Sequence, residues 1–165
     1  HRQGANRSCF LDAEGFLTKP LPLIEEGVFR NFLYHVESAN KENKSSTGHA
    51  VRGYSGGIGT RSHNLVWPTG EFSLEQLCAQ NSKCLLVTQL EGQAGCNPVS
   101  GDISIGVQGF LIENGLRIQP VDSITLAGNF FDVLLNIRGS GNTYQPELTH
   151  SFIPALLIEG LTVSG

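Results

Sequence analysis

The chain has 165 residues, a formal net charge of −4 at pH 7, 39% hydrophobic residues and only 16% charged residues. This length favours one domain, and the composition supports a packed core while excluding a mainly disordered chain. The acidic balance argues against general nucleic-acid binding, which requires a basic surface. The 20 glycines indicate many tight turns and therefore a β-rich chain.

The sequence also indicates the cellular compartment and the state of the cysteines. It lacks a run of about 18 apolar residues, so we expect no membrane span. The polar start at 1–8 lacks the apolar stretch of a secretory signal, and we expect a cytoplasmic protein. Because methionine is absent and the chain begins with histidine, we expect a processed chain or a fragment. We expect Cys9, Cys78, Cys84 and Cys96 to be mostly buried free thiols, since they form no CxxC pair.

The first part of the chain is typical of short strands joined by turns. Residues 1–7 are expected to be extended. The runs 8–12 and 16–18 flank a turn, as do 24–25 and 28–29. Residues 37–61 are polar, glycine-rich and poor in apolar side chains. We expect this stretch to form a long surface loop of the kind that is often functional.

The second part contains the clearest signals. Ser73 to Gln76 fits a capping box and predicts a short helix. Strands are expected at 84–90, 103–107, 123–127, 155–158 and 161–163, with a glycine-rich loop at 92–101. Asn114-Gly115 predicts a type I′ hairpin between 110–113 and 116–118. Asn129 is expected to cap a second helix that stops near Gly139, and 140–150 is expected to be a loop.

These patterns predict a single α+β domain over 1–165. Its fold would be predominantly antiparallel β, with sandwich- or barrel-like sheets and two short helices.

Candidate catalytic groups are few. Gly53 to Gly57 matches the G-x-S-x-G pattern, but a nucleophile elbow at Ser55 needs a strand before the serine and a helix after it. No two histidines have the i, i+4 spacing of a helical zinc motif. His150 is the histidine that we would single out as a contributor to a shared metal site. The residues alone therefore predict no catalytic apparatus and no metal site within this chain.

An ordered series of motifs is similar to the C-terminal domain of the TldD/PmbA family. The motifs are Leu11-Asp12-Ala13-Glu14-Gly15, Leu23 to Val28, Thr47-Gly48-His49-Ala50, Leu85 to Thr88, Asn97 to Ser104, Gly109 to Gly115, Pro120-Val121, Ile124 to Asn129 and Leu157 to Val163. The resemblance covers nearly the whole chain from Ser8 onward.

The resemblance implies a part in a metallopeptidase system that takes unfolded peptides, or in modulation of DNA gyrase. TldD-type members carry HExxxH and a later cysteine as zinc ligands and work with a PmbA/TldE-type partner. This chain has no HExxxH, and 141–154 has no cysteine. It therefore resembles the PmbA/TldE side, with no catalytic residue and no cofactor of its own. Zinc would belong to a partner subunit or to a preceding part of the protein.

The resemblance suggests roles for the glycine loops. We expect Gly53, Gly56, Gly57, Gly59, Gly95, Asn97, Gly101 and Asp102 to line a peptide path or a contact with a homo- or hetero-oligomeric partner of the TldD/PmbA type. The two other hypotheses are a regulatory binding module without proteolysis, similar to a gyrase modulator, and a serine hydrolase that uses Ser55. None of the three involves direct binding of nucleic acid or a membrane.

Overall fold

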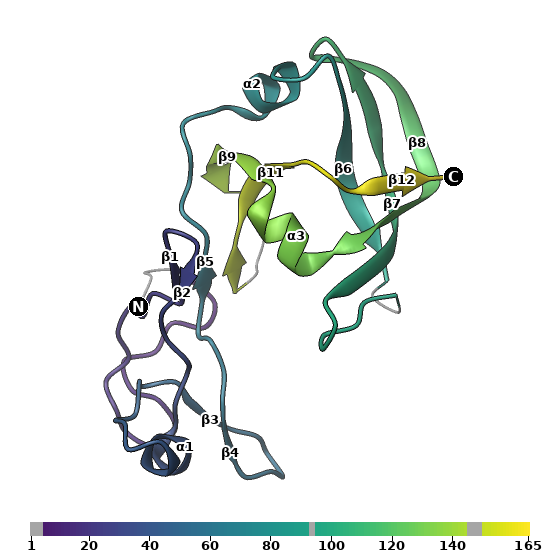
Figure 1. Cartoon of the computed structure of the whole chain (residues 1–165). Coiled ribbons are helices and arrows are strands. Elements are labelled where there is room, and N and C mark those ends of the chain that lie inside the picture. The colour runs from purple at the N-terminus through teal and green to yellow at the C-terminus, as the bar shows by residue number, and fades with distance from the viewer. Residues whose placement is uncertain (1–4, 93–94, 145–149) are drawn as a thin grey trace. The chain divides into compact units, whose positions relative to one another are not determined.

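The structure is a computed structural model that describes the chain except for residues 1–4, 93–94 and 145–149 (Figure 1). The chain divides into two compact units, and the single domain over 1–165 stays a prediction. The first unit comprises 1–67 and 146–152, and the second comprises 68–145 and 153–165.

Short elements make up the first unit. They are β1 (Ile24–Glu25), β2 (Val28–Phe29), α1 (Val36–Lys41), β3 (Ala50–Arg52), β4 (Ile58–Thr60), β5 (Leu65–Val66) and β10 (Ser151–Phe152). β1 pairs with β2 and β3 with β4, both antiparallel, whereas β5 and β10 are parallel. The β1–β2 turn forms as predicted, with Glu26 and Gly27 at φ 51° and 76°.

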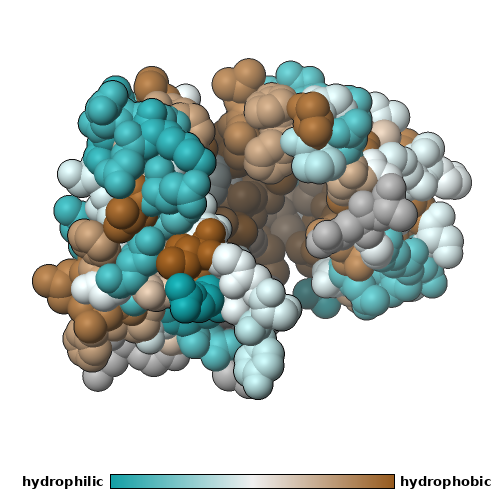
Figure 2. Space-filling view, turned by 90° about the horizontal axis from the view of Figure 1, so that it is seen from below, coloured by the Kyte–Doolittle hydropathy of each residue, from teal (hydrophilic) through white to brown (hydrophobic). Residues whose placement is uncertain are grey.

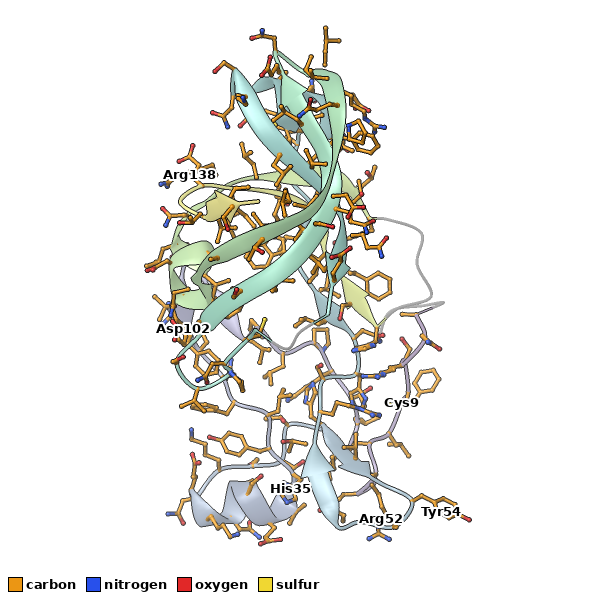
Figure 3. All side chains as sticks on the ribbon, turned by 90° about the vertical axis from the view of Figure 1, so that its right-hand side faces the viewer. Cys9, His35, Arg52, Tyr54, Asp102 and Arg138 are labelled. Atoms are coloured by element: carbon orange, nitrogen blue, oxygen red, sulfur yellow. The ribbon has the colours of Figure 1, made fainter. Side chains whose placement is uncertain are left out.

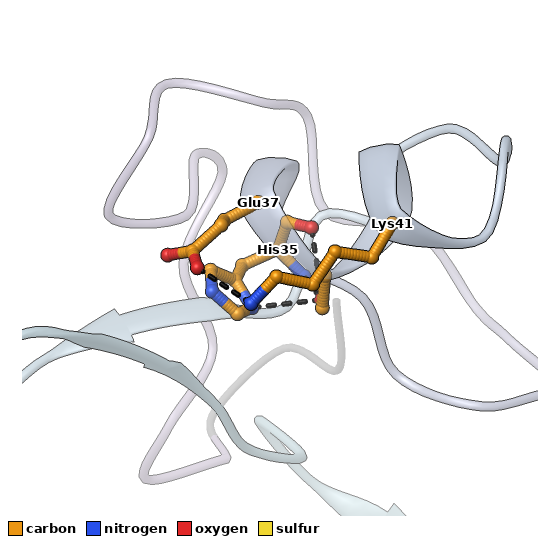
Figure 4. Close-up of polar contacts among 4 residues, drawn as sticks. His35, Glu37 and Lys41 are labelled. Atoms are coloured by element: carbon orange, nitrogen blue, oxygen red, sulfur yellow. Dashed lines mark hydrogen bonds and ion pairs between the residues drawn. The ribbon is translucent and has the colours of Figure 1, made fainter.

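The expected long loop over 37–61 is wrong in part, because it contains most of α1 and the β3–β4 hairpin. α1 begins after His35, whose ring nitrogen Nδ1 lies 2.8 Å from the Ser38 hydroxyl, while the His35 amide donates to that hydroxyl at 3.1 Å (Figure 4). Lys41 pairs with Glu37 one turn earlier at 2.7 Å. Residues 1–4 of the expected extended start lie outside the described residues, and Asn6 and Arg7 form a turn.

The second unit contains the longer strands. Its elements are α2 (Leu74–Ala79), β6 (Lys83–Glu91), β7 (Asp102–Glu113), β8 (Leu116–Asn129), α3 (Phe130–Leu135), β9 (Ile137–Tyr144), β11 (Pro154–Ile158) and β12 (Thr162–Ser164). An antiparallel four-stranded sheet has the order β12-β8-β7-β6, and β9 pairs with β11 (Figure 1). The predominantly antiparallel α+β class is therefore confirmed.

The core of the second unit lies on β7 and α2. Val107 and Ile112 in β7 are almost fully buried, and Leu77 and Cys78 of α2 are also buried. The Ser73 hydroxyl accepts from the Gln76 amide, as the capping box predicts. The Asn114-Gly115 hairpin is also confirmed, with both residues at positive φ.

Four further predictions need correction. The described residues contain a third helix, α1, beyond the expected two. The second expected helix ends at Leu135, well before Gly139, and β9 occupies part of the expected loop 140–150. All four cysteines are free, but only Cys78 is buried, since Cys9, Cys84 and Cys96 are partly exposed.

Candidate functional site

The β3–β4 turn carries the first group of predicted site residues. Gly53, Gly56 and Gly57 lie in the turn and Gly59 lies in β4. A Cβ added at Gly56, Gly57 or Gly59 would meet no atom within 4 Å, so this hairpin is open to solvent. Tyr54 at its tip points away from the unit and is fully exposed (Figure 3).

Ser55 lies in the same turn and lacks the setting of a nucleophile elbow. It follows β3 and precedes β4, so the chain continues into a strand where the elbow requires a helix. The geometry therefore does not favour the serine-hydrolase hypothesis.

The other predicted residues come together in the second unit. The Asn97 amide donates to the Asp102 carbonyl at 2.9 Å, and the Gly101 amide donates to the Asn97 carbonyl at 2.8 Å. The Asn97 side chain closes the loop by accepting from the Val99 amide at 2.9 Å. Gly95 lies against β7, where its carbonyl accepts from Ser104. These four predicted residues therefore build the loop itself.

Asp102 extends this network to the start of α3. The Ser100 hydroxyl donates to the Asp102 carboxylate at 2.6 Å, and the Asn129 amide group donates to it at 3.2 Å. The hydrogen bond from Ser100, and to a smaller extent the one from Asn129, holds the pKa of Asp102 below its usual value. A carboxylate already occupied by two donors is suited to stabilising the loop.

His150 has a backbone role in the described part of the chain. Its carbonyl accepts from the Leu65 amide at 2.8 Å, next to the β5–β10 pair. Among the residues that the structure describes, no group of three or more histidine, cysteine or acidic side chains is placed to hold a metal ion. None of the helices described is long and apolar enough to span a membrane.

The four-stranded sheet has open edges. In the described ranges β6 pairs only with β7, so no strand covers its outer edge. β12 pairs with β8 only at Thr125 to Ala127, which leaves the edge of 116–124 without a strand among the described residues. Pro120 lacks an amide proton and Ser123 has φ 55°, so the β8 edge is poorly suited to further pairing. β6 contains no proline and is the better template for an additional strand.

A polar cluster in the first unit is not predicted by any local sequence pattern. Asp12 is buried, and its carboxylate accepts from the Glu14 and Phe16 amides at 2.9 Å each and from the Ala50 amide at 3.0 Å. Burial favours a raised pKa for Asp12, but these backbone donors lower it overall. The carboxylate therefore joins the first turn of the chain to β3.

Two histidines complete this polar cluster. The rings of His49 and His63 stack with centroids 5.2 Å apart. His49 is buried, and its Nδ1 lies 2.9 Å from the Thr47 carbonyl. Burial lowers the pKa of His49 and favours its neutral form. The sequence signal that could have revealed this cluster is the pair of motifs around Asp12 and His49, which the fold brings into contact.

Comparison with known proteins places these motifs in a family. The chain is 39% identical to the metalloprotease PmbA of Escherichia coli O157:H7 over 134 residues, covering 81% of the chain and 28% of that protein. It is 42% identical to the PmbA homologue of Haemophilus influenzae over 155 residues, covering 93% of the chain and 32% of the homologue. The chain thus spans about a third of the length of these relatives.

Solved structures give the same result. A candidate modulator of a DNA gyrase from Thermotoga maritima is 34% identical with a TM-score of 0.89, covering 99% of this chain and 37% of that one. TldE from Thermococcus kodakarensis is 28% identical with a TM-score of 0.86, covering 95% of this chain and 36% of that one. The family model for the PmbA/TldA metallopeptidase C-terminal domain matches residues 1–165. The chain therefore belongs to the PmbA/TldD metallopeptidase family and matches its C-terminal domain over its full length.

Proposed function

We propose that this chain is the non-catalytic, PmbA/TldE-type part of a cytoplasmic metallopeptidase system that acts on unfolded peptides. In this proposal it supplies a peptide-holding strand edge and a contact with a TldD-type subunit. Any zinc is held by that subunit or by another part of the parent protein.

The observation that carries the proposal is the open outer edge of β6. An extended peptide can add to such an edge through main-chain hydrogen bonds, which tolerate many sequences. This suits a system that must accept unfolded chains of varied sequence. Along β6 the exposed residues cluster after Val87, and Leu90 is 61% exposed, so a bound peptide would also find an apolar side chain there.

Exposed apolar side chains support a subunit contact. Hydrophobic residues appear among polar ones on the face seen in Figure 2. In the second unit the exposed large hydrophobic residues include Leu116 at 69%, Ile118 at 52%, Phe131 at 57% and Leu135 at 75%. Contiguous exposed apolar patches mark interaction sites, and in this proposal these side chains contribute to the subunit contact. Since the chain is about a third of its relatives, other parts of the protein or a second subunit would cover them.

Hydrogen exchange with a short unstructured peptide tests strand addition. We expect exchange of amides in β6 to slow when peptide is added, while the already paired amides of β7 and the amides of β1–β2 do not change. Two peptides N-methylated at alternate residues provide the matched control. Only one of the two should lose binding, because alternate amides of an added strand face the edge. The proposal would be contradicted if both peptides bound equally well, or if exchange slowed only at amides outside β6.

Co-purification tests the subunit contact and the assignment of zinc. We expect a TldD-type subunit to bind the full-length protein that contains this chain, and to carry the zinc of the complex. The present chain alone should hold less than stoichiometric zinc after dialysis, and His150→Ala should leave the zinc content of the complex unchanged. Stoichiometric zinc on this chain that is lost in His150→Ala would refute the non-catalytic assignment.

A regulatory module without proteolysis is the second candidate, since the Thermotoga maritima structure carries the description of a gyrase modulator. This candidate would be favoured over the first if the full-length protein that contains this chain bound gyrase directly and added peptide did not slow hydrogen exchange in β6.

A further inference from the structure

A thiol–imidazole pair lies in the first unit and has no part in the proposed peptide binding. The Cys9 Sγ atom lies 3.5 Å from Nδ1 of His63, although 54 residues separate the two in sequence. Cys9 is partly exposed, and Figure 3 marks its place in the first unit. Two chemically complementary groups, a nucleophile and a base, are thus held at contact distance.

The other ring nitrogen of His63 determines which way the proton moves. Nε2 lies 2.9 Å from the Gly48 carbonyl oxygen, which can only accept a hydrogen bond. Nε2 therefore carries a proton, and in the neutral ring Nδ1 is left with its lone pair facing Cys9. The thiol donates to a base that a third group orients, which is the arrangement of activated nucleophiles.

The backbone around the pair is firmly held. Gly48 has φ 73°, and a Cβ at this position would lie 2.5 Å from the Leu17 carbonyl oxygen, so the Gly48 carbonyl is fixed by a close approach of two backbones. The Thr18 hydroxyl donates to the Cys9 carbonyl. Stacking on His49 restrains the ring of His63 from its face.

Two of the other cysteines have contrasting surroundings. Cys78 is buried in α2. The Cys84 thiol donates to the Cys78 carbonyl at 3.7 Å, and burial raises the pKa of Cys84. A carbonyl partner can only accept the hydrogen bond of a thiol, whereas an imidazole partner can also accept its proton when the sulfur reacts. The fourth cysteine, Cys96, is partly exposed like Cys9.

We propose that Cys9 is a reactive thiol that forms mixed disulfides with low-molecular-weight disulfides, with His63 as its base. His63 Nδ1 takes the thiol proton, and Cys9 Sγ attacks one sulfur of the disulfide. A new sulfur–sulfur bond forms at Cys9 and the original disulfide bond breaks. The leaving thiolate then takes the proton from the imidazolium, so Cys9 is oxidised while the departing thiol is reduced.

The expected gain in rate is set by thiolate chemistry. The attacking species is the thiolate, so a base that takes the thiol proton as the sulfur attacks accelerates the exchange. We expect an increase in rate of about tenfold.

The test is the rate of reaction with 2,2′-dithiodipyridine at pH 7, with the modified cysteine located by peptide mapping. Cys9 should react about tenfold faster in the native protein than in denaturant, because only the folded chain places His63 beside it. Cys9→Ser should remove the fast phase, and the control Cys96→Ser should retain it. His63→Gln, checked for folding by circular dichroism, should reduce the native rate to the denatured value or below.

Each result is decisive for the thiol. If native Cys9 reacts more slowly than denatured Cys9, or if folded His63→Gln reacts as fast as the parent, the proposal is overturned. Should His63→Gln fail to fold, the comparison of native with denatured parent protein still decides the question. Peptide protection of β6 is read out separately, so failure of one proposal leaves the other standing.

Discussion

The carboxylate of Asp12 accepts a hydrogen bond from the backbone amide of Ala50 at 3.0 Å, across 38 residues of sequence. The reverse contact is also present, since the Ala13 amide donates to the Ala50 carbonyl at 3.1 Å. Glu14 adds a second link, because its carboxylate accepts from the Val36 amide in the first turn of α1 at 2.8 Å. One acidic turn thus anchors both β3 and α1.

We predict that Asp12→Asn destabilises the chain by about 2–3 kcal/mol, because the new amide group would point a donor at a backbone donor in a buried site. Chemical denaturation at pH 7 measures this loss. The control is Asp122→Asn on the exposed surface of β8, which should leave the midpoint unchanged. An Asp12→Asn midpoint equal to that of Asp122→Asn would contradict the assigned role.

The pH dependence of the same variant gives a second check. The pKa of Asp12 is lowered in the folded state, so its contribution is complete above the ordinary value of 3.8 and is lost as pH falls through the folded pKa. The difference in free energy of unfolding between the parent and Asp12→Asn should therefore shrink as the pH is lowered below 3.8. A constant difference down to the lowest accessible pH would rule out the carboxylate as its source.

Local chemistry made the second unit the more predictable part of the fold. Asn114 and Gly115 adopt the positive φ values that their hairpin requires, and Ser73 caps α2 through its own turn. Each of these signals spans no more than four residues of sequence. α1 escaped prediction because its N-cap is His35, which is not among the usual capping residues, and because the helix has only six residues.

Long-range pairing explains what the sequence could not reveal of the candidate sites. Asp12, His49 and Cys9 each stand in ordinary turn or strand patterns, and nothing local indicates that they meet. The contact between Cys9 and His63 depends on the first unit closing over 54 residues. The glycine loops were found from composition, but composition could not distinguish the open β3–β4 turn from a packed loop such as that at Gly95.

Gly48→Ala should reduce stability by more than about 1 kcal/mol, because Gly48 has φ 73° and an added Cβ would lie 2.5 Å from a carbonyl oxygen of the backbone. Thermal unfolding provides the measurement. Gly59→Ala is the matched control, since its Cβ would meet no atom within 4 Å and its φ is not in the left-handed region. Similar melting temperatures for the two variants would show that the backbone at Gly48 can relax.

Gly95→Ala tests whether this predicted site residue is structural. Its Cβ would lie 1.8 Å from the Ser104 carbonyl oxygen, so the loop must move away from β7 and weaken the bond from the Ser104 amide. We expect a loss of about 1–3 kcal/mol and faster hydrogen exchange at Ser104. Gly56→Ala, whose Cβ would be in open space, should show neither effect. Unchanged exchange at Ser104 in Gly95→Ala would argue against a packed loop.

Asn129 combines two functions that substitutions can separate. Its side-chain oxygen accepts from the Phe131 amide at 3.0 Å and caps α3, while its amide nitrogen donates to the Ser100 carbonyl at 2.9 Å and to Asp102. Asn129→Ala removes both functions and should cost about 1–2 kcal/mol. Asn129→Asp keeps the cap but loses both donors and places a second negative charge beside Asp102.

If the cap were the main contribution, Asn129→Asp would be as stable as the parent at pH 7. We expect it instead to be at least as destabilised as Asn129→Ala, because like charges at this distance repel and the Ser100 carbonyl loses its donor. The Asn129→Asp variant should also recover part of its stability relative to Asn129→Ala as the pH falls below about 4 and the paired carboxylates become protonated. Denaturation of the three proteins at both pH values separates the cap from the loop network, and full stability of Asn129→Asp at pH 7 would assign the role of Asn129 to the cap alone.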